Sequence, residues 1–430
     1  MHRLLRFVIG GCLLATAYTL APAWQRIPLD AGLDFYHYWG IAYARDEMPL
    51  VHANPFRYPA EYRAKLAAMA AASPDRALEA VYRARSGLDL TNTPLLYAAT
   101  RLLPNQYLRA LSVYRCVQLL AIAVGMLMLW RLVGIRTWRG ATLWSALLLA
   151  AYDPLVLDLH VANLASVQLL GLVFAIALSL HVAHGSRLAL LALAGWLPAL
   201  VILKPNLLLP LTLLGIGGLR QSPATLRLPF VAVASAVAAL CIEIGSYYFA
   251  SPVIWIDWAR VLFSHDDRLA YAYALGNYSF AHQLSLARHW SLLATSSLLT
   301  FGGLLILVGV PWALSRATGH QATLLPTAEA GLWWASIGVV ITLGGAPLVW
   351  QHYYVWALVP IVYLVAGANH AWLARLAGGL GFIGCAGMLR AYYHNVAGTE
   401  PAWLPLANCL GWAPLAVGLF ITRLAPARPA

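Results

Sequence analysis

Charged side chains are scarce in this chain. They make up 10% of its 430 residues, whereas soluble domains carry about 25%, and apolar residues reach 61%. Such a composition excludes an ordinary soluble domain. It predicts an all-α polytopic membrane protein in which most of the chain crosses or lines a bilayer.

Lysine is rarer than any other charged residue. Two lysines stand against 26 arginines, and the formal net charge is +12. The basic residues lie singly at the ends of apolar runs instead of clustering with aromatic residues, so we expect no nucleic-acid partner. Their spacing is typical of residues that mark membrane topology.

Neither the cysteines nor the one glycine-rich motif predicts a metal or cofactor site. The five cysteines all fall inside apolar runs, which predicts neither a disulfide framework nor a zinc site. Gly379-Leu-Gly-Phe-Ile-Gly384 spells a dinucleotide fingerprint, but no strand precedes it and the surrounding run is apolar. This pattern favours close packing between helices over cofactor binding.

Long apolar runs are what the chain has in abundance. A bilayer core about 30 Å thick needs about 20 apolar residues per helix. The runs predict eleven or twelve spans, near 5–24, 107–131, 141–157, 163–182, 187–203, 206–219, 228–250, 291–314, 331–349, 353–370, 373–390 and 404–422. We expect the first run to be a retained helix and not a cleaved secretory signal. Lys204-Pro-Asn206 makes the sixth run a candidate broken or re-entrant element.

Charge bias orients these spans. One set of alternate connections carries twelve arginines and almost no acid except Glu329, whereas the opposite set is acidic, which predicts that both chain ends are cytoplasmic. Two long connections, 25–106 and 251–290, then lie outside. The first contains an amphipathic stretch near 60–85 that we expect to form a short interfacial helix. We treat 1–430 as a single integral-membrane domain.

Asp34 is the leading candidate for chemistry. It lies in Leu33-Asp-Phe-Tyr-His-Tyr-Trp39, just past the first apolar run and at the start of the first long loop. A partly desolvated carboxylate at the mouth of a helix bundle has the proton affinity that a general base needs. The alternative to a catalytic role is that Asp34 is a solvated acid among the Trp and Tyr residues that gather at membrane interfaces.

Lys204 is the second candidate. A cation inside an apolar stretch usually faces a cavity or a partner, and our topology puts it on the same side as Asp34. It suits a phosphate contact, helped by the helix N-terminus that follows Pro205. The structural alternative is a lysine that snorkels at a helix end.

Further polar residues fall on the same predicted face. His352 in Val349-Trp-Gln-His-Tyr-Tyr354 suits a second donor to a phosphate or sugar, although a lone histidine is more often structural. The other candidates for substrate binding include neighbours of Asp34 and Lys204 in the sequence. They are Tyr36, His37, Tyr38, Asn163, Gln168, Asn206, Asn277, Ser279, Gln351 and Tyr353.

These motifs, in this order, resemble glycosyltransferase family 87, the polyprenol-phosphate-mannose-dependent mannosyltransferases among the integral-membrane C-type glycosyltransferases. The similar segments are Asp34-Phe-Tyr-His-Tyr38, Asn54-Pro-Phe56, Thr93-Pro-Leu95, Asn163 with Gln168, Lys204-Pro205, Asn277-Tyr-Ser279 and His352-Tyr-Tyr354. One departure, on the acceptor side, is that the family's second Tyr-Pro-Pro step is missing and that Tyr58-Pro-Ala60 and Thr93-Pro-Leu95 are present instead.

The resemblance implies an enzyme of the bacterial plasma or inner membrane with an extracytoplasmic site. It would transfer a sugar, with mannose favoured, from a polyprenyl-phosphate donor to a lipid-linked or glycan acceptor, with inversion and with Asp34 as base. Lys204 and His352 would contact the donor phosphate. No cofactor is implied. A requirement for a divalent metal stays open: Asp34, Asp158 and Asp266 could assemble a site, but no ligand spacing demands one.

Two other functions stay open. A transporter or lipid flippase would use the same polar groups as a substrate path, although transporters generally show internal repeats and midplane polar residues. A polysaccharide ligase with a lipid-pyrophosphate donor would rely on basic residues late in the chain. The second long loop supplies Arg260, Arg268, His282, Arg288 and His289.

Overall fold

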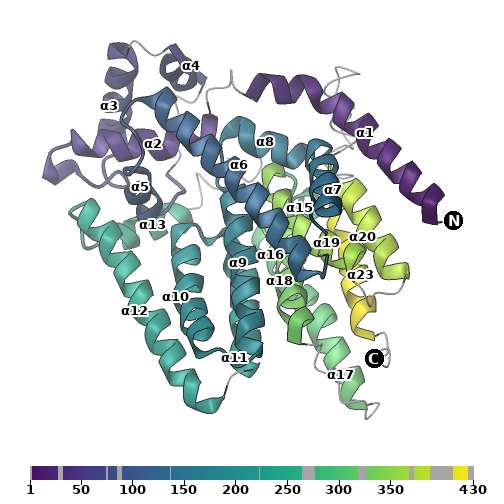
Figure 1. Cartoon of the computed structure of the whole chain (residues 1–430). Coiled ribbons are helices and arrows are strands. Elements are labelled where there is room, and N and C mark those ends of the chain that lie inside the picture. The colour runs from purple at the N-terminus through teal and green to yellow at the C-terminus, as the bar shows by residue number, and fades with distance from the viewer. Residues whose placement is uncertain are drawn as a thin grey trace.

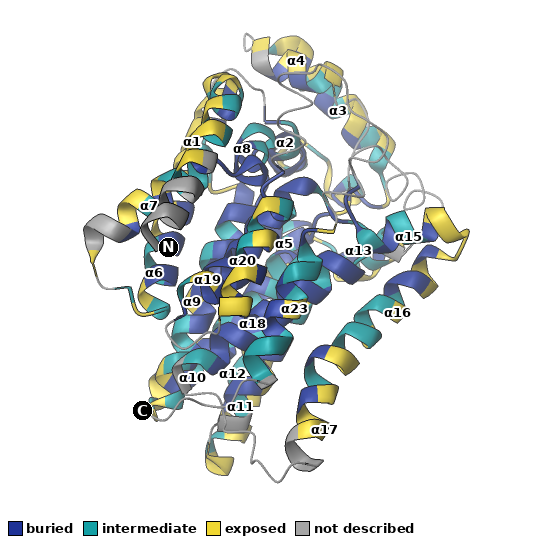
Figure 2. Cartoon of the chain, turned by 90° about the vertical axis from the view of Figure 1, so that its right-hand side faces the viewer, coloured by how far each residue is buried: buried dark blue, intermediate teal, exposed yellow. Residues whose placement is uncertain are grey.

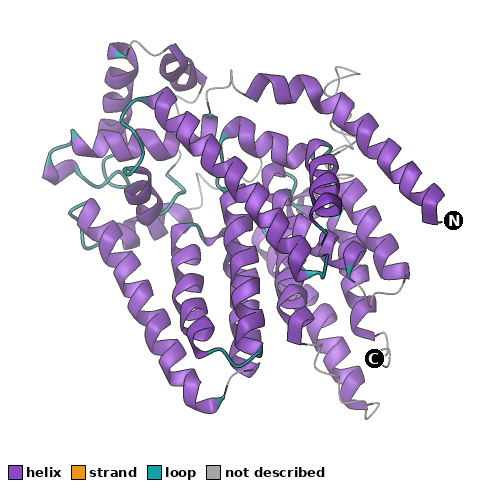
Figure 3. Ribbon diagram, viewed as in Figure 1, coloured by secondary structure: helices purple, strands orange, loops and turns teal. Residues whose placement is uncertain are grey.

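The computed structural model describes residues 2–27, 32–73, 76–84, 90–135, 137–221, 223–263, 277–317, 327–367, 372–387 and 410–424. Within these ranges the fold is all-helical, without strands and with one isolated β-bridge between Asn277 and Trp350 (Figure 3). The predicted all-α class is therefore confirmed for the described part of the chain.

The first half of the chain forms an upper group of short helices and the beginning of a bundle of longer ones (Figure 1). These elements are α1 (His2–Arg26), α2 (Leu33–Asp46), η2 (Leu50–His52), α3 (Pro59–Ala72), α4 (Arg76–Ala84), α5 (Pro94–Thr100), α6 (Tyr107–Leu132), α7 (Trp138–Ala150), α8 (Asp153–Val161), α9 (Ala165–Ala183), α10 (Arg187–Leu203), η3 (Pro205–Leu207) and α11 (Leu208–Gln221).

The second half completes the bundle. Its elements are α12 (Ala224–Tyr248), α13 (Ile254–Phe263), α15 (Phe280–Arg288), α16 (Leu292–Leu304), the π-turn η4 (Leu305–Gly309), α17 (Val310–Ala317), α18 (Thr327–Gly345), η5 (Gln351–Ala357), α19 (Leu358–Ala366), α20 (Trp372–Cys385) and α23 (Trp412–Leu424).

Several helices are long and apolar enough to cross a membrane. Among the described residues there are four, Tyr107–Leu132, Ala165–Ala183, Ala224–Tyr248 and Leu292–Leu314, and five shorter apolar helices of 10–17 residues. α12 and the α16–α17 helix are the most open to the surroundings, with 17% of each apolar window buried (Figure 2). This arrangement fits a membrane protein, and the count of eleven or twelve spans stays a prediction.

Two predicted spans have a different form from the one expected. The run 141–157 is not one straight helix, because it bends by 71° between Ala141–Ala150 and Asp153–Val161. The run 206–219 is not broken internally, because one apolar helix covers Pro205–Leu219, and a re-entrant path stays a prediction. α11 lies antiparallel to α10, with Gly215 beside Leu197 and Gly218 beside Leu193, so the chain reverses direction at Lys204.

The described parts of the segment 25–106 are mostly helical rather than loop-like. The predicted amphipathic stretch is helical, as α3 and α4, but Asp34 lies in the first turn of a further helix, α2, and not in a loop. Ten consecutive residues of α2, from Phe35 to Ala44, are buried against α3, α5 and neighbouring helices. Burial on all sides stabilises this helix, and no amphipathic period in the sequence reveals it.

Close contacts between helices form the remaining core. Gly381 and Gly384 lie where α20 packs against Leu415 and Gly411, at the beginning of α23. Two of the three glycines of the motif, Gly381 and Gly384, therefore serve helix packing, as the sequence context indicates. Figure 2 shows the buried residues gathered on the inner faces of this bundle.

Candidate functional site

Asp34 is half-buried near the beginning of α2. Gly32 precedes the helix with a φ of 68°, and a Cβ there would lie 2.6 Å from the Leu111 side chain. Tyr107 donates a hydrogen bond to the Gly32 carbonyl at 3.2 Å. Glycine thus permits the sharp turn that directs the beginning of α2 toward Asn163, just before the beginning of α9.

Asn163 joins Asp34 to the other candidate residues. Its Nδ2 donates to Asp34 Oδ2 at 2.6 Å and to the Tyr38 hydroxyl at 3.1 Å. Its Oδ1 accepts from Lys204 Nζ at 3.3 Å. Lys204 Nζ also donates to the Tyr38 hydroxyl at 3.1 Å. Four residues from α2, the α8–α9 turn and the α10–α11 turn therefore form one polar cluster.

The α8–α9 turn holds Asn163 through several buried bonds. Ala162 has a left-handed conformation with φ 52°, and the Asn163 carbonyl accepts from the Tyr114 hydroxyl at 2.8 Å and from Gln118 Nε2 at 2.7 Å. The fully buried Asp158 accepts from the backbone amides of Ala165 and Ser166, at the N-terminus of α9. A carboxylate at that position stabilises the helix start.

Lys204 is buried between α10 and η3, with 7% of the residue exposed. Its ammonium lies 5.3 Å from the ring centroid of Tyr38 and 5.9 Å from that of Tyr353, within the range of a cation–π contact. Gln168 Nε2 donates to the Lys204 carbonyl at 3.4 Å. Lys204 does not snorkel toward solvent, because its head group points into the cluster.

His352 and Tyr353 close another side of the cluster, from η5. His352 is 4% exposed and interacts electrostatically with both Asp34 and Lys204. Its Nε2 has no hydrogen-bond partner among the described residues. The Tyr353 ring stacks on Trp356 at 4.9 Å and meets the His352 ring edge-on at 4.6 Å, which fixes both side chains.

Two further buried polar atoms near Lys204 also lack partners in the described structure. They are Gln168 Oε1 and Asn206 Nδ2. Both belong to segments that contact Lys204, by hydrogen bond or along the chain. Since buried polar groups are nearly always satisfied, their grouping with His352 Nε2 indicates space for a polar ligand or water.

Some candidates have structural contacts instead. Asn277 accepts from the amides of Ser279 and Val349 and donates to the Pro347 carbonyl, and the Ser279 hydroxyl donates to the Ala346 carbonyl. These bonds fasten the beginning of α15 to the segment before η5. They hold the backbone that leads into Gln351 and His352.

Three other candidates, Gln351, Tyr36 and His37, contact residues outside the polar cluster. Gln351 Nε2 donates to Asp153 on α8. Tyr36 packs edge-on against Tyr107 at 6.4 Å, and burial raises the pKa of its phenol, which therefore stays protonated. His37 is buried beside the Tyr36 ring at 5.5 Å.

Sequence reasoning missed the residues that hold Asn163 in place. Tyr114, Gln118 and the capping role of Asp158 belong to this group. A glutamine inside the long apolar run of α6 is the one signal that pointed to a buried polar contact.

No metal centre emerges from the described residues, since no group of three or more His, Cys, Asp or Glu side chains among them is arranged to hold an ion. Asp266, one of the three acids considered for such a site, lies outside the described residues, as does Arg268.

Known proteins add no family assignment. No family model matches the chain, and neither the curated proteins nor the solved structures yield a significant match. The function must therefore be argued from the cluster of Asp34, Tyr38, Asn163 and Lys204.

Proposed function

We propose that this chain is a membrane glycosyltransferase that moves a sugar, with mannose favoured, from a polyprenyl-phosphate donor to a lipid-linked or glycan acceptor. The site would face the extracytoplasmic side, and the chain would be similar to glycosyltransferase family 87. The observation that carries the proposal is that a carboxylate, Asp34, and a buried ammonium, Lys204, bind the same Asn163 side chain.

This juxtaposition supplies the two groups that an inverting transfer needs. The Asp34 carboxylate would accept the proton of the acceptor hydroxyl as that oxygen attacks the anomeric carbon. The bond between that carbon and the phosphate oxygen breaks on the opposite face, and the electron pair stays on the phosphate. The proton ends on Asp34, and the products are a glycosylated acceptor and polyprenyl phosphate.

Lys204 would stabilise the leaving phosphate. Negative charge grows on that group in the transition state, so a fixed cation in a water-poor setting lowers the barrier more than it favours the ground state. His352 Nε2 and Asn206 Nδ2, for which the described residues supply no hydrogen-bond partner, are further candidates to contact the phosphate. The aromatic rings of Tyr38 and Tyr353 offer apolar faces against which a sugar ring can pack.

The test is the substitution Asp34→Asn, which keeps the shape and removes the proton-accepting capacity. We expect transfer of radiolabelled sugar from a polyprenyl-phosphate donor to fall about 10²-fold or more, as for loss of a general base. The matched control is Asp46→Asn at the other end of α2, where Asp46 pairs with Arg101 and has no role in the cluster.

A wild-type transfer rate in Asp34→Asn would refute the role of Asp34. A transporter or flippase predicts a different result, namely uptake into liposomes without any transfer product. Running both assays on the same preparation separates the two functions.

A further inference from the structure

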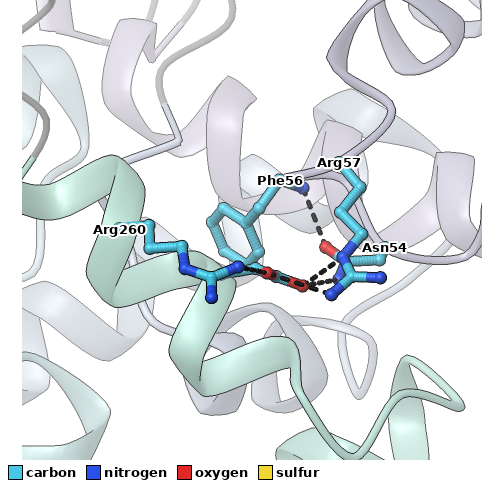
Figure 4. A network of polar contacts seen from close by, with 5 residues as sticks. Asn54, Phe56, Arg57 and Arg260 are labelled. Atoms are coloured by element: carbon cyan, nitrogen blue, oxygen red, sulfur yellow. Dashed lines mark hydrogen bonds and ion pairs between the residues drawn. The ribbon is translucent and has the colours of Figure 1, made fainter.

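A second polar network connects the two long connections of the chain (Figure 4). Asp257 on α13 accepts from Asn54 Nδ2 at 2.8 Å, from Arg57 Nε at 2.6 Å and from Arg260 Nη1 at 3.3 Å. Asn54 in turn accepts the Phe56 amide at 3.0 Å, which closes a tight turn. The two arginines therefore converge on one carboxylate from segments about 200 residues apart.

The carboxylate is buried, whereas the arginines are open. The Asp257 side chain is 6% exposed, that of Arg57 is 50% exposed and that of Arg260 is 74% exposed. The hydrogen bond and the negative charge of Asp257 raise the pKa of Arg57, which stays charged. Three N–H groups of the two arginines donate to Asp257, whereas the two guanidinium groups carry five N–H groups each, so most of these donors have no bond to the carboxylate.

The ratio of cations to acids in this network differs from that in the other ion pairs of the segment 25–106. Lys65 pairs with Glu47, Arg83 with Glu79 and Arg101 with Asp46, one cation to one acid. Asp257 is instead shared by two arginines. Within the described residues, the network thus has one positive charge in excess, on two guanidinium groups that a buried anchor has already oriented.

The network lies at the same end of the bundle as the candidate site. Trp258, next to Asp257, donates to the Thr91 carbonyl at 3.2 Å, and Thr93 donates to the Leu203 carbonyl at 2.7 Å. Leu203 directly precedes Lys204. These two hydrogen bonds, through the segment Thr91–Thr93, therefore link the arginine pair to the turn that contains Lys204.

We propose that Arg57 and Arg260 form a second anion site, which binds the phosphate or diphosphate group of a membrane-anchored lipid. Guanidinium groups held in a fixed orientation bind such groups through paired, charge-assisted hydrogen bonds. That this lipid is the glycosyl acceptor rests on the proposed function. The acceptor phosphate would then bind to the two long connections, while the donor phosphate binds near Lys204.

The experiment measures binding of inorganic pyrophosphate by calorimetry, with the full chain in phosphatidylcholine nanodiscs. All variants carry Lys204→Gln, which removes the proposed donor-phosphate contact. We expect this background to bind pyrophosphate, and Arg57→Gln with Arg260→Gln to weaken that binding about tenfold or more. Arg83→Gln, at an exposed arginine on α4 that already pairs with Glu79, is the matched control and should leave binding unchanged.

Equal affinity for pyrophosphate with and without the double substitution would overturn the proposal. The arginines would then have only a structural role, in joining the two long connections. The same holds if Lys204→Gln alone abolishes binding. If the double variant does not fold, Arg260→Gln alone serves, because Arg57 still holds Asp257 through two hydrogen bonds, and a partial loss is expected.

Repeating the pyrophosphate titration in nanodiscs that contain phosphatidylglycerol distinguishes a bulk lipid headgroup from a substrate phosphate as the natural ligand. Loss of pyrophosphate binding in its presence assigns the site to bulk lipid headgroups, and retained binding assigns it to a substrate phosphate. Both results support an anion site. The Asp34→Asn transfer assay is independent of this readout, so failure of one proposal is distinguishable from failure of the other.

Discussion

Asn163 and Tyr38 are the two neutral residues that connect Asp34 to Lys204. The amide of Asn163 donates on one side and accepts on the other, and the Tyr38 hydroxyl accepts from both Asn163 and Lys204. Each charged group is thus oriented by a neutral partner. Such orientation matters for the proposed chemistry, since displacements of about 1 Å at a reacting group cost large factors in rate.

Tyr38→Phe tests this orientation. The substitution keeps the ring, and with it the packing, but removes an acceptor from a buried ammonium. A hydrogen bond to a charged group contributes about 1.5–3 kcal/mol, so we expect sugar transfer to fall about tenfold or more while the protein still folds. The measurements are the transfer rate and the thermal unfolding temperature. Tyr247→Phe, at a residue that is 85% exposed, is the control. A wild-type rate in Tyr38→Phe would rule out the hydroxyl as a positioning group.

Helix pairs carry the stability of the bundle. α20 and α23 approach so closely that a Cβ at Gly384 would lie 2.5 Å from the Cα of Gly411, whereas a Cβ at Gly379, in the same motif, meets nothing within 4 Å. The two glycines therefore differ in function although they lie on the same helix. One permits contact between backbones and the other only weakens the helix.

Gly384→Ala and Gly379→Ala should accordingly have opposite effects. Backbone atoms cannot move aside cheaply, so overpacking at Gly384 should cost about 1–3 kcal/mol in unfolding free energy and lower the melting temperature in detergent. At Gly379, alanine is the better helix former by up to about 1 kcal/mol, and the melting temperature should hold or rise. Equal melting curves for the two variants would contradict the observed packing of α20 on α23.

At the scale of the whole molecule, one end of the bundle gathers the polar groups. α9 begins there, α10 ends there, and the helices of 25–106 pack over these ends (Figure 1). α10, with 17 residues, spans about 25 Å between this end and its beginning at Arg187. The charge bias of the connections predicts that the polar end is extracytoplasmic.

Single cysteines placed at the two ends test this orientation. Val51 is 73% exposed beside the polar end, and Leu188 is 79% exposed at the opposite end of α10. In a background whose five native cysteines are changed to serine, we expect a membrane-impermeant maleimide to label Val51→Cys in intact cells and Leu188→Cys only after permeabilisation. The reverse pattern would show that the site faces the cytoplasm and would remove the basis for an extracytoplasmic donor.

The sequence by itself determined the class of the fold and the positions of the apolar helices. Hydropathy is a local property, because each run of apolar residues must bury or face lipid wherever it lies. The same reasoning singled out Asp34 and Lys204, since a charge next to or inside an apolar run is costly unless it has a partner. It also favoured helix packing for the Gly379–Gly384 motif.

Only the tertiary structure decided which polar groups meet. The Asn163 bridge depends on the left-handed Ala162 and on bonds from Tyr114 and Gln118, and no local pattern encodes these distant contacts. α2 was missed for the same reason: its stability comes from burial on every side by segments far away in the chain. Asn277 and Ser279 turned out to fasten the segment before η5, because the partner of a polar side chain is fixed by packing and not by its neighbours in sequence.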